Sequence, residues 1–535
     1  MSTEGAVRVV VVPVADSVLA STDATRLQPA KPPPPPPPPS PPPPPPPTPS
    51  VVGRRRPIAI IFALAVSAAL ASLLPRFNIK TFLGNGTDDL GMSLGAPSSR
   101  IEQVALYVGR VNTELTVSWA APLTPRGQIP SGSRLFYGVG ALIYSSPATC
   151  SQYSAPPSYA SPALCHANFS HFSSVAASWY RVGDDTNGWS STSLYVHRMP
   201  DVGEAGATFA VVGDVGTTAD SASTLTGVAE AHARSPFAAL LLVGDISYAD
   251  GDQSIWDEWG RLSSRLLSRL PLATIPGNHE WFDTENEPCD YTQPPYCNYT
   301  FAAYLARSHT PRAALSSSNG GASSSLYYSF DAGLAHVIML QGYCPMMKHV
   351  HEQPCLADGS LQALWLIDDL KHVDRDKTPW IIVSFHQPFV NSNHAHSHAE
   401  GNPIKEAIEA TLNAYGVDLV LSGHVHAYER SARTRDGQCD PAAPVYITIG
   451  DGGNREGLET AWTNPQPEWS LFRQSSYGHG QFTAFNATHA QWRWLQNTAL
   501  APSLLDQVFF IKGQAGQCGG GVTRVPQRRR LGSPI

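Results

Sequence analysis

The sequence lacks several features that mark common classes of protein. Its eight cysteines include no Cys-x-x-C spacing, so the usual zinc-ribbon and dithiol redox motifs are absent. Charged residues make up only 15% of the 535 residues, and a formal net charge of -7 gives no general attraction to nucleic acid. A hydrophobic share of 42% is still enough to build cores, and the length predicts about two folded domains.

Proline is in excess, with 48 residues, but much of it lies in one tract at 32–47. Proline has no backbone N–H to donate to a helix or sheet, so this tract is expected to be polyproline II or disordered. We therefore predict that residues 1–50 form an unstructured tail.

An uncharged apolar stretch follows at residues 57–75, directly after three arginines. It is about long enough to cross a bilayer, and the positive-inside rule then places the tail in the cytoplasm and everything after Arg76 in the lumen or outside. We predict an uncleaved membrane anchor. A cleaved signal peptide is the alternative, because Ala69-Leu70-Ala71 resembles a cleavage site and would leave a secreted protein.

Cysteines and glycosylation acceptors agree with export from the cytosol. Four Asn-x-Ser/Thr acceptors follow the apolar stretch, at Asn85, Asn168, Asn298 and Asn486. The cysteines fall largely in near pairs, namely Cys150/Cys165, Cys289/Cys297 and Cys344/Cys355, with Cys439 and Cys518 left over. We predict structural disulfides, whose connectivity the sequence does not determine.

The remaining chain divides by its hydrophobic rhythm. Residues 76–100 are expected to be a stalk, and short alternating strands over 101–203 predict a small all-β sandwich. From 204 to 497 strand-like runs alternate with helical stretches, which predicts an α/β domain with helices covering central sheets. The expected helices are 219–234, 253–270, 360–373 and 403–415, the last capped by Asn402 with Pro403 in its first turn. Residues 498–535 are expected to be a tail.

Metal-binding side chains follow strand after strand in the α/β region. Ligands of open α/β sheets bind beyond the carboxyl ends of the strands, so these side chains should meet. The candidates are Asp214, Asp245, Tyr248, Asn278, His386, His424 and His426. Seven are too many for one tetrahedral ion but suit two octahedral-type ions that share a carboxylate. A phenolate with carboxylates favours a trivalent ion, whereas amide oxygen with imidazoles suits a divalent one.

These blocks, in order, carry a family resemblance. GDVG, GDISYAD, GNHE, VSFHQPF and GHVHAYERS resemble the five motifs of the purple acid phosphatases, a branch of the calcineurin-like metallophosphoesterases. The likeness covers roughly residues 101–495, and the all-β segment resembles the fibronectin type III-like domain of the plant-type members. Most relatives in the superfamily begin with Asp-x-His, whereas this chain has Asp-Val-Gly, so Tyr248 takes the place of the missing imidazole.

The resemblance implies a binuclear centre with Asp245 as the bridge. Fe³⁺ would be held by Asp214, Asp245, Tyr248 and His426. A second ion, Zn²⁺, Mn²⁺ or Fe²⁺, would be held by Asp245, Asn278, His386 and His424. The sequence does not distinguish these three choices of second metal.

Two histidines are expected to serve catalysis and substrate binding together with Asn278. His279 adjoins a ligand, and His396 falls on a family histidine whether the loop is aligned from its N-terminal or its C-terminal side. His394 and His398 lie in the same loop, where a one-residue ambiguity in spacing leaves their correspondence open. An imidazolium could protonate the leaving group, which favours acidic to neutral pH.

The implied activity is hydrolysis of phosphate monoesters, and of anhydrides, by attack of a metal-bound hydroxide on phosphorus. A phosphodiesterase or pyrophosphatase using the same residues is one alternative. A surface-anchored binding protein with weak catalysis is another, which the full set of seven ligands disfavours. Small phosphate esters are the expected partners, and the sequence leaves the oligomeric state undetermined.

Overall fold

The computed structural model describes residues 100–111, 114–155, 158–169, 177–190, 194–281, 301–311, 325–343, 356, 359–396, 398–499 and 501–513. All of them belong to one compact unit, 94–535. The predicted tail, the apolar stretch at 57–75, nearly all of the stalk, and the acceptors Asn85 and Asn298 lie outside the described residues. Within the described residues, no helix combines the length and apolar character needed to cross a bilayer.

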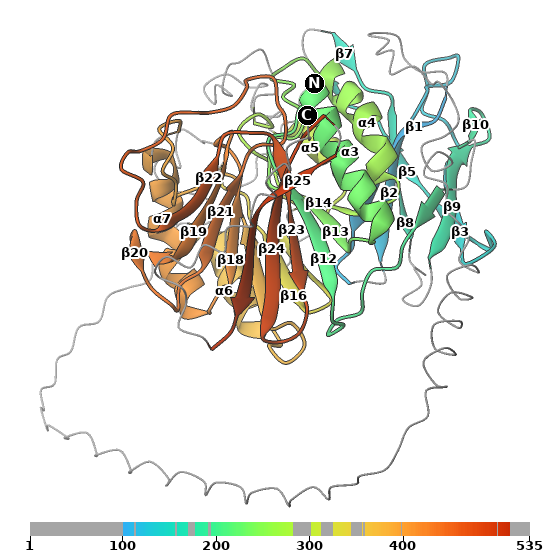
Figure 1. Ribbon diagram of the computed structural model, residues 1–535. Coiled ribbons are helices and arrows are strands. Elements are labelled where there is room, and N and C mark those ends of the chain that lie inside the picture. Colours follow the sequence, from blue (N-terminus) through green and yellow to red (C-terminus); the bar gives the residue numbers. More distant parts are fainter. Residues whose placement is uncertain are drawn as a thin grey trace, which may run out of the picture. The chain divides into compact units, whose positions relative to one another are not determined.

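Two sheets pack face to face at the centre and helices cover their outer faces (Figure 1). One sheet has ten strands in the order β25-β24-β23-β12-β13-β14-β1-β2-β8-β5. Its α/β half comprises β12 (Ala207–Val212), β13 (Ala239–Leu242), β14 (Leu272–Thr274), β23 (Gly478–Ala484), β24 (His489–Gln496) and β25 (Ser503–Ile511). The β12–β13–β14 pairs are parallel, as expected for strands joined by helices.

The second central sheet has eight strands, in the order β15-β16-β17-β18-β21-β19-β20 with β22 beside β19. Its strands are β15 (Tyr328–Ala332), β16 (Ala335–Met339), β17 (Trp380–Ser384), β18 (Leu419–Ser422), β19 (Tyr428–Arg435), β20 (Gln438–Cys439), β21 (Val445–Ile449) and β22 (Ser470–Gln474). The run β16–β17–β18–β21 is parallel.

The molecule has four layers, namely helices, sheet, sheet and helices, because successive side chains of a strand point to opposite faces of its sheet. Phe209 and Val211 of β12 enter the core between the sheets, whereas Ala210 and Val212 pack under the helices on the other face. These helices are α3 (Ala219–Arg234), α4 (Ser254–Leu267) and α5 (Ala302–Arg307). Helices α6 (Leu361–His372) and α7 (His398–Ala414) cover the second sheet in the same way, through a third core. The α/β architecture expected from the sequence, with helices covering central sheets, is confirmed.

The N-terminal part is β-rich, as predicted, and its strands form two packed sheets. Strands β1 (Glu102–Val108), β2 (Leu115–Ala121), β5 (Thr149–Ser151) and β8 (Ala163–Phe169) end the ten-stranded sheet. The facing sheet holds β3 (Arg134–Gly138), β4 (Tyr144–Pro147), β9 (Ser178–Asp184), β10 (Gly188–Trp189) and β11 (Leu194–Val196), and β6 (Ser154–Ala155) pairs with β7 (Tyr159–Ala160). The Cys150–Cys165 disulfide joins β5 to β8, and Cys439 is disulfide-bonded as well.

The β-sandwich and the α/β region share both a sheet and a cluster of polar side chains. Strand β1 pairs in parallel with β14, so one sheet runs through both parts. Arg307 of α5 forms an ion pair with Asp257 of α4 at 2.8 Å. Arg307 is buried, with 9% of its surface exposed. Its guanidinium also donates to the Tyr159 hydroxyl and to Gln103 of β1.

Two boundaries differ from the sequence prediction. The tail expected from residue 498 is wrong over 503–511, because β25 pairs along its length with β24 and buries Asp506 and Phe510. Helix α7 begins at His398, so Asn402 is not its cap and Pro403 lies inside it.

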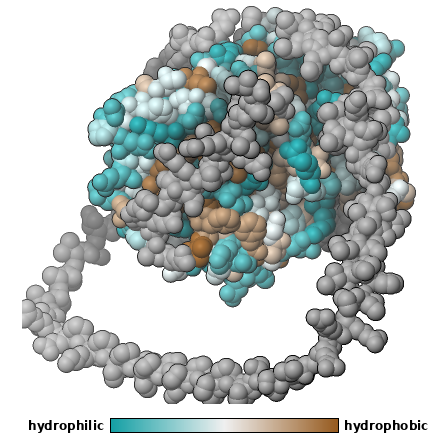
Figure 2. Space-filling model, in the orientation of Figure 1, coloured by the Kyte–Doolittle hydropathy of each residue, from teal (hydrophilic) through white to brown (hydrophobic). Residues whose placement is uncertain are grey.

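Hydrophilic and apolar residues are intermixed over the visible face of the molecule (Figure 2).

Candidate metal centre

All seven predicted ligands gather where strands of both central sheets end. Asp214 follows β12, Asp245 and Tyr248 follow β13, and Asn278 follows β14. His386 follows β17, while His424 and His426 follow β18. The sheets thus bring together residues that lie more than 200 positions apart, through contacts such as the two from the His424 N–H to the Asp214 carboxylate at 2.9 and 3.0 Å.

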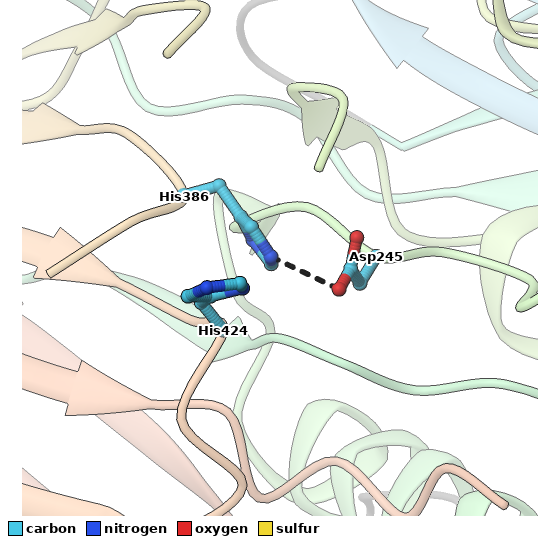
Figure 3. Close-up of side chains that lie close together, drawn as sticks. All are labelled: Asp245, His386 and His424. Carbon is cyan, nitrogen blue, oxygen red and sulfur yellow. Dashed lines mark ion pairs between the residues drawn. The ribbon is translucent and has the colours of Figure 1, made fainter. Parts of the chain in front are cut away.

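One cluster consists of Asp245, His386 and His424 (Figure 3). Their candidate ligand atoms all lie within 4.8 Å of one another, and His386 Nε2 is 3.0 Å from Asp245 Oδ2. His386 donates from Nδ1 to the Val243 carbonyl at 2.8 Å, which turns Nε2 toward the cluster. Asp245 Oδ2 and His386 Nε2 are both buried, and neither makes a hydrogen bond within the described residues.

Asn278 joins this cluster through its amide oxygen. Oδ1 lies 2.9 Å from His424 Nδ1 and accepts a hydrogen bond from the Tyr343 hydroxyl at 3.2 Å. Tyr343 was not among the predicted site residues, since a lone tyrosine after a strand carries no local signal of a metal site.

A second cluster consists of Asp214, Tyr248 and His426. The Tyr248 hydroxyl donates to Asp214 Oδ1 at 3.2 Å and lies 3.0 Å from His426 Nε2, which is itself 3.5 Å from Asp214 Oδ1. All three side chains are buried. Burial, together with the neighbouring Asp214 carboxylate, raises the pKa of the Tyr248 phenol well above its usual value, so a cation is needed to bind it as phenolate.

The turns that hold these side chains are tight and sterically exclusive. Asp214, Asp245, Tyr248 and His424 all have positive φ, between 50° and 69°. A Cβ at Gly423 would overlap Oδ2 of Asp214, so only glycine fits before the His-x-His pair. This close approach lets the backbone N–H of His424 donate to the Asp214 carboxylate.

His279 lies beside both clusters without belonging to either. Its Nδ1 is 2.6 Å from Asp250, its Nε2 is 3.6 Å from Glu456, and its ring packs on Tyr248 at 4.0 Å. Burial lowers the pKa of His279, but Asp245, Asp250 and Glu456 outweigh it and raise the pKa to about 11. These three carboxylates therefore favour the charged form of the His279 ring.

The histidine-rich loop is brought only partly to the site. His396, at φ 51°, places its ring 3.8 Å from that of His424, whereas His394 is exposed and bonds through its backbone N–H to Ala461. The side chain of His398 lies outside the described residues. Glu400, four residues after His396, lies 2.6 Å from His424 Nε2 and was missed by the sequence reasoning.

A second missed residue fastens two of the ligand loops together. The buried Glu280 carboxylate accepts hydrogen bonds from the N–H groups of Ile246 and Gly277, both at 2.8 Å. These N–H groups adjoin Asp245 and Asn278. The GNHE block contained Glu280, but its acceptor role needs the three-dimensional approach of the two loops.

The donor set fits two cations. Carboxylate, phenol, amide and imidazole groups converge from five strand ends, and a facing pair of buried polar atoms has no hydrogen bond, which is costly unless an ion binds there. Asp245 Oδ2 faces His386 Nε2 at 3.0 Å, while its Oδ1 accepts a hydrogen bond from the backbone N–H of His279 at 2.9 Å.

Comparisons with known proteins agree with this geometry. Residues 207–428 match the family model of calcineurin-like phosphoesterases, and residues 443–507 match that of the iron/zinc purple acid phosphatase-like protein C. Purple acid phosphatase 18 of Arabidopsis thaliana is 42% identical over 303 residues, 57% of this chain and 62% of that protein. The chain thus spans less than two thirds of that relative.

Other relatives are covered more fully. Purple acid phosphatase 15 of Arabidopsis thaliana is 32% identical over 418 residues, 67% of this chain and 73% of that protein. Phosphoenolpyruvate phosphatase of Allium cepa is 38% identical over 348 residues, 62% of this chain and 66% of that protein. The solved purple acid phosphatase from yellow lupin (Lupinus luteus) seeds shares the fold, with a TM-score of 0.65 at 18% identity over 77% of this chain and 74% of that one.

Proposed function

This chain belongs to the purple acid phosphatases, and on that premise we propose that it hydrolyses phosphate monoesters at a binuclear metal centre. The observation that carries the proposal is the convergence of all seven ligand-type side chains around a buried, unsatisfied Asp245–His386 pair. A binding protein that had lost catalysis would have no need to keep every one of these groups.

The ligand set divides by chemistry between two ions. Fe³⁺ would be held by Asp214, Asp245, Tyr248 and His426, and a divalent ion, Zn²⁺, Mn²⁺ or Fe²⁺, by Asp245, Asn278, His386 and His424. When bound, such a pair lowers the pKa of a water nucleophile and neutralises charge on the phosphoryl group.

The remaining residues bind and orient the ester. In its protonated form, which the neighbouring carboxylates favour, His279 can donate a hydrogen bond from Nε2 to a phosphate oxygen while Asp250 holds Nδ1 at 2.6 Å. The half-buried His396 packs against the His424 ring, where it can bind the phosphate or protonate the departing alkoxide oxygen. Both roles favour a phosphate monoester, whose terminal phosphate group carries more negative charge than that of a diester.

An exported location is supported by covalent features. The Cys150–Cys165 disulfide is typical of oxidising compartments, and the acceptors Asn168 and Asn486 are both exposed. We therefore place the catalytic region in the lumen or outside the cell. The anchor at 57–75, or its cleavage to give a secreted enzyme, stays a prediction that protease protection of the N-terminal tail in sealed membranes would decide.

The test combines metal analysis with a phosphate-release screen. Purified protein should contain two metal ions and release phosphate from monoesters, with phosphoenolpyruvate included because the onion relative bears that name. Diesters and pyrophosphate in the same screen measure the alternative activities. His424→Ala is the inactive control, and a wild-type protein without metal or phosphate release would refute the proposal.

A further inference from the structure

Glu400 contacts His424, a proposed ligand of the divalent ion, on the side of the ring away from Asn278. It lies in the first turn of α7, and its Oε2 is 2.6 Å from His424 Nε2 and 3.5 Å from His396 Nδ1. The Glu400 side chain is 49% exposed, whereas that of His424 is 6% exposed. An acid at the surface therefore reaches a buried imidazole of the metal centre.

The two nitrogens of His424 face different groups. Nε2 faces the Glu400 carboxylate, which can only accept, so this nitrogen carries the proton. Nδ1 faces the Asn278 oxygen at 2.9 Å, also an acceptor, and that oxygen already accepts the Tyr343 hydroxyl. A neutral imidazole carries one proton, so with Nε2 protonated the lone pair of Nδ1 points at the Asn278 oxygen. A cation bound by both Nδ1 and Oδ1 would satisfy these two facing acceptors.

His386 has the same arrangement with a different partner. The Val243 carbonyl accepts from its Nδ1 at 2.8 Å and leaves Nε2 for the metal. One imidazole of the divalent site is thus oriented by a neutral carbonyl and the other by a carboxylate. A carboxylate behind the ring fixes its tautomer and increases its basicity as a ligand.

We propose that Glu400 is a positioning residue for the divalent ion, which it holds through His424 without contacting the metal. The inference rests on the proposed function, since it concerns the same binuclear centre. Glu400 makes no contact with Asp214, Tyr248 or His426 among its described interactions, so its influence is confined to one of the two ions.

The test measures metal affinity rather than turnover. Wild type, Glu400→Gln and Glu400→Ala, each loaded with iron alone, are titrated with Zn²⁺ against a competing chelator. We expect Glu400→Ala to weaken Zn²⁺ binding about 10- to 100-fold and Glu400→Gln to weaken it less, because the amide oxygen still accepts from Nε2. Glu406→Gln, an exposed acid of the same helix, is the matched control and should bind Zn²⁺ as wild type does.

Iron content and the visible phenolate-to-iron band separate the outcomes. Both should be unchanged in the Glu400 variants. Unchanged Zn²⁺ affinity in Glu400→Ala would overturn the inference, and so would equal loss of iron and zinc, which indicates a general structural role. Complete loss of Zn²⁺ binding in both variants would overturn it too, because it would make Glu400 a direct ligand. A wild-type protein that binds neither metal would instead refute the proposed function.

Discussion

The turns of the β-sandwich and the turns of the metal centre reach the same backbone conformation with different residues. In the sandwich, Gly127, Gly132, Gly140 and Gly188 have φ between 71° and 78°, where glycine carries no Cβ penalty. At the metal centre, aspartate, tyrosine and histidine occupy left-handed conformations instead.

The difference shows where the fold tolerates strain. Nine described non-glycine residues have positive φ, and six of them are at the site or contact it: Asp214, Asp245, Tyr248, Asp250, His396 and His424. Each such residue costs on the order of 1–3 kcal/mol and persists only where the surroundings hold it. The sandwich turns need only to reverse the chain, whereas the site turns must also present a side chain.

The largest expected effect comes from exchanging a buried aspartate in each region. Asp245→Asn should reduce phosphate release to background and lower metal content, because the amide cannot bridge two cations. Asp184→Asn alters a buried acid that accepts the N–H groups of Thr186 and Asn187 in a sandwich turn, so it should lower the melting temperature but keep activity per folded molecule. Equal activity losses in the two variants would remove the distinction.

A pair of glycine substitutions gives the next largest effect. Gly423→Ala should lower kcat by orders of magnitude, because the added Cβ overlaps the Asp214 carboxylate. Gly127→Ala, at φ +71° with nothing within 4 Å, should cost about 1 kcal/mol of stability and leave kinetics unchanged. Kinetics and denaturant unfolding of both variants check this, and an active Gly423→Ala would contradict the tight approach.

Tyr248→Phe should have a smaller effect on activity and a complete effect on colour. The substitution removes the phenolate but leaves Asp214, Asp245 and His426 for the iron. We expect the visible band to disappear while iron is retained with lower affinity. Absorption spectra with parallel iron analysis make the measurement, and a variant that kept the band would assign the colour elsewhere.

The smallest effect on activity is expected at His336, a histidine of β16 outside both regions. Burial lowers its pKa, but Asp331 at 2.6 Å and Asp369 at 2.9 Å outweigh burial and raise the pKa to about 9. Its stabilising contribution, at most about 3 kcal/mol, is therefore full below about pH 6.5 and is lost as the pH rises through 9.

His336→Gln should accordingly lower the melting temperature more at pH 6 than at pH 10, with unchanged activity per folded molecule at both. Melting curves across this range provide the check. A difference that grows toward alkaline pH would show that the ring is neutral between its two carboxylates.

Local patterns were enough to pick out the seven candidate ligands, because each one comes within a few residues of the end of an apolar strand. Helix α3 was predicted residue for residue, and the structure adds that Thr218 caps it by accepting from the Asp220 and Ser221 N–H groups. Groups that act through distant neighbours were not predictable in this way. Glu280 and Glu400 matter only because the loop of Glu280 and the first turn of α7 approach Ile246 and His424 in space.

Long-range pairing also escaped local patterns. Strand β25 follows a segment that looks like a tail, and only its ladder with β24 makes it a strand. Helix α7 starts at His398, five residues earlier than Pro403 suggested. Its first turn carries Glu400, whose contact with His424 is a long-range interaction that no local pattern shows. The parallel pairing of β1 with β14 cannot be read from either strand, because it joins segments about 165 residues apart.

That pairing has a consequence for any attempt to isolate the catalytic region. Strand β14 has β13 on one side and β1 on the other, and its residues Leu272, Ala273 and Thr274 are buried. A fragment beginning after the sandwich would leave β14 as an uncovered edge strand, with a row of unpaired N–H and C=O groups beside apolar side chains. Such an edge is a template for intermolecular β-pairing, so the sandwich protects the catalytic half from aggregation.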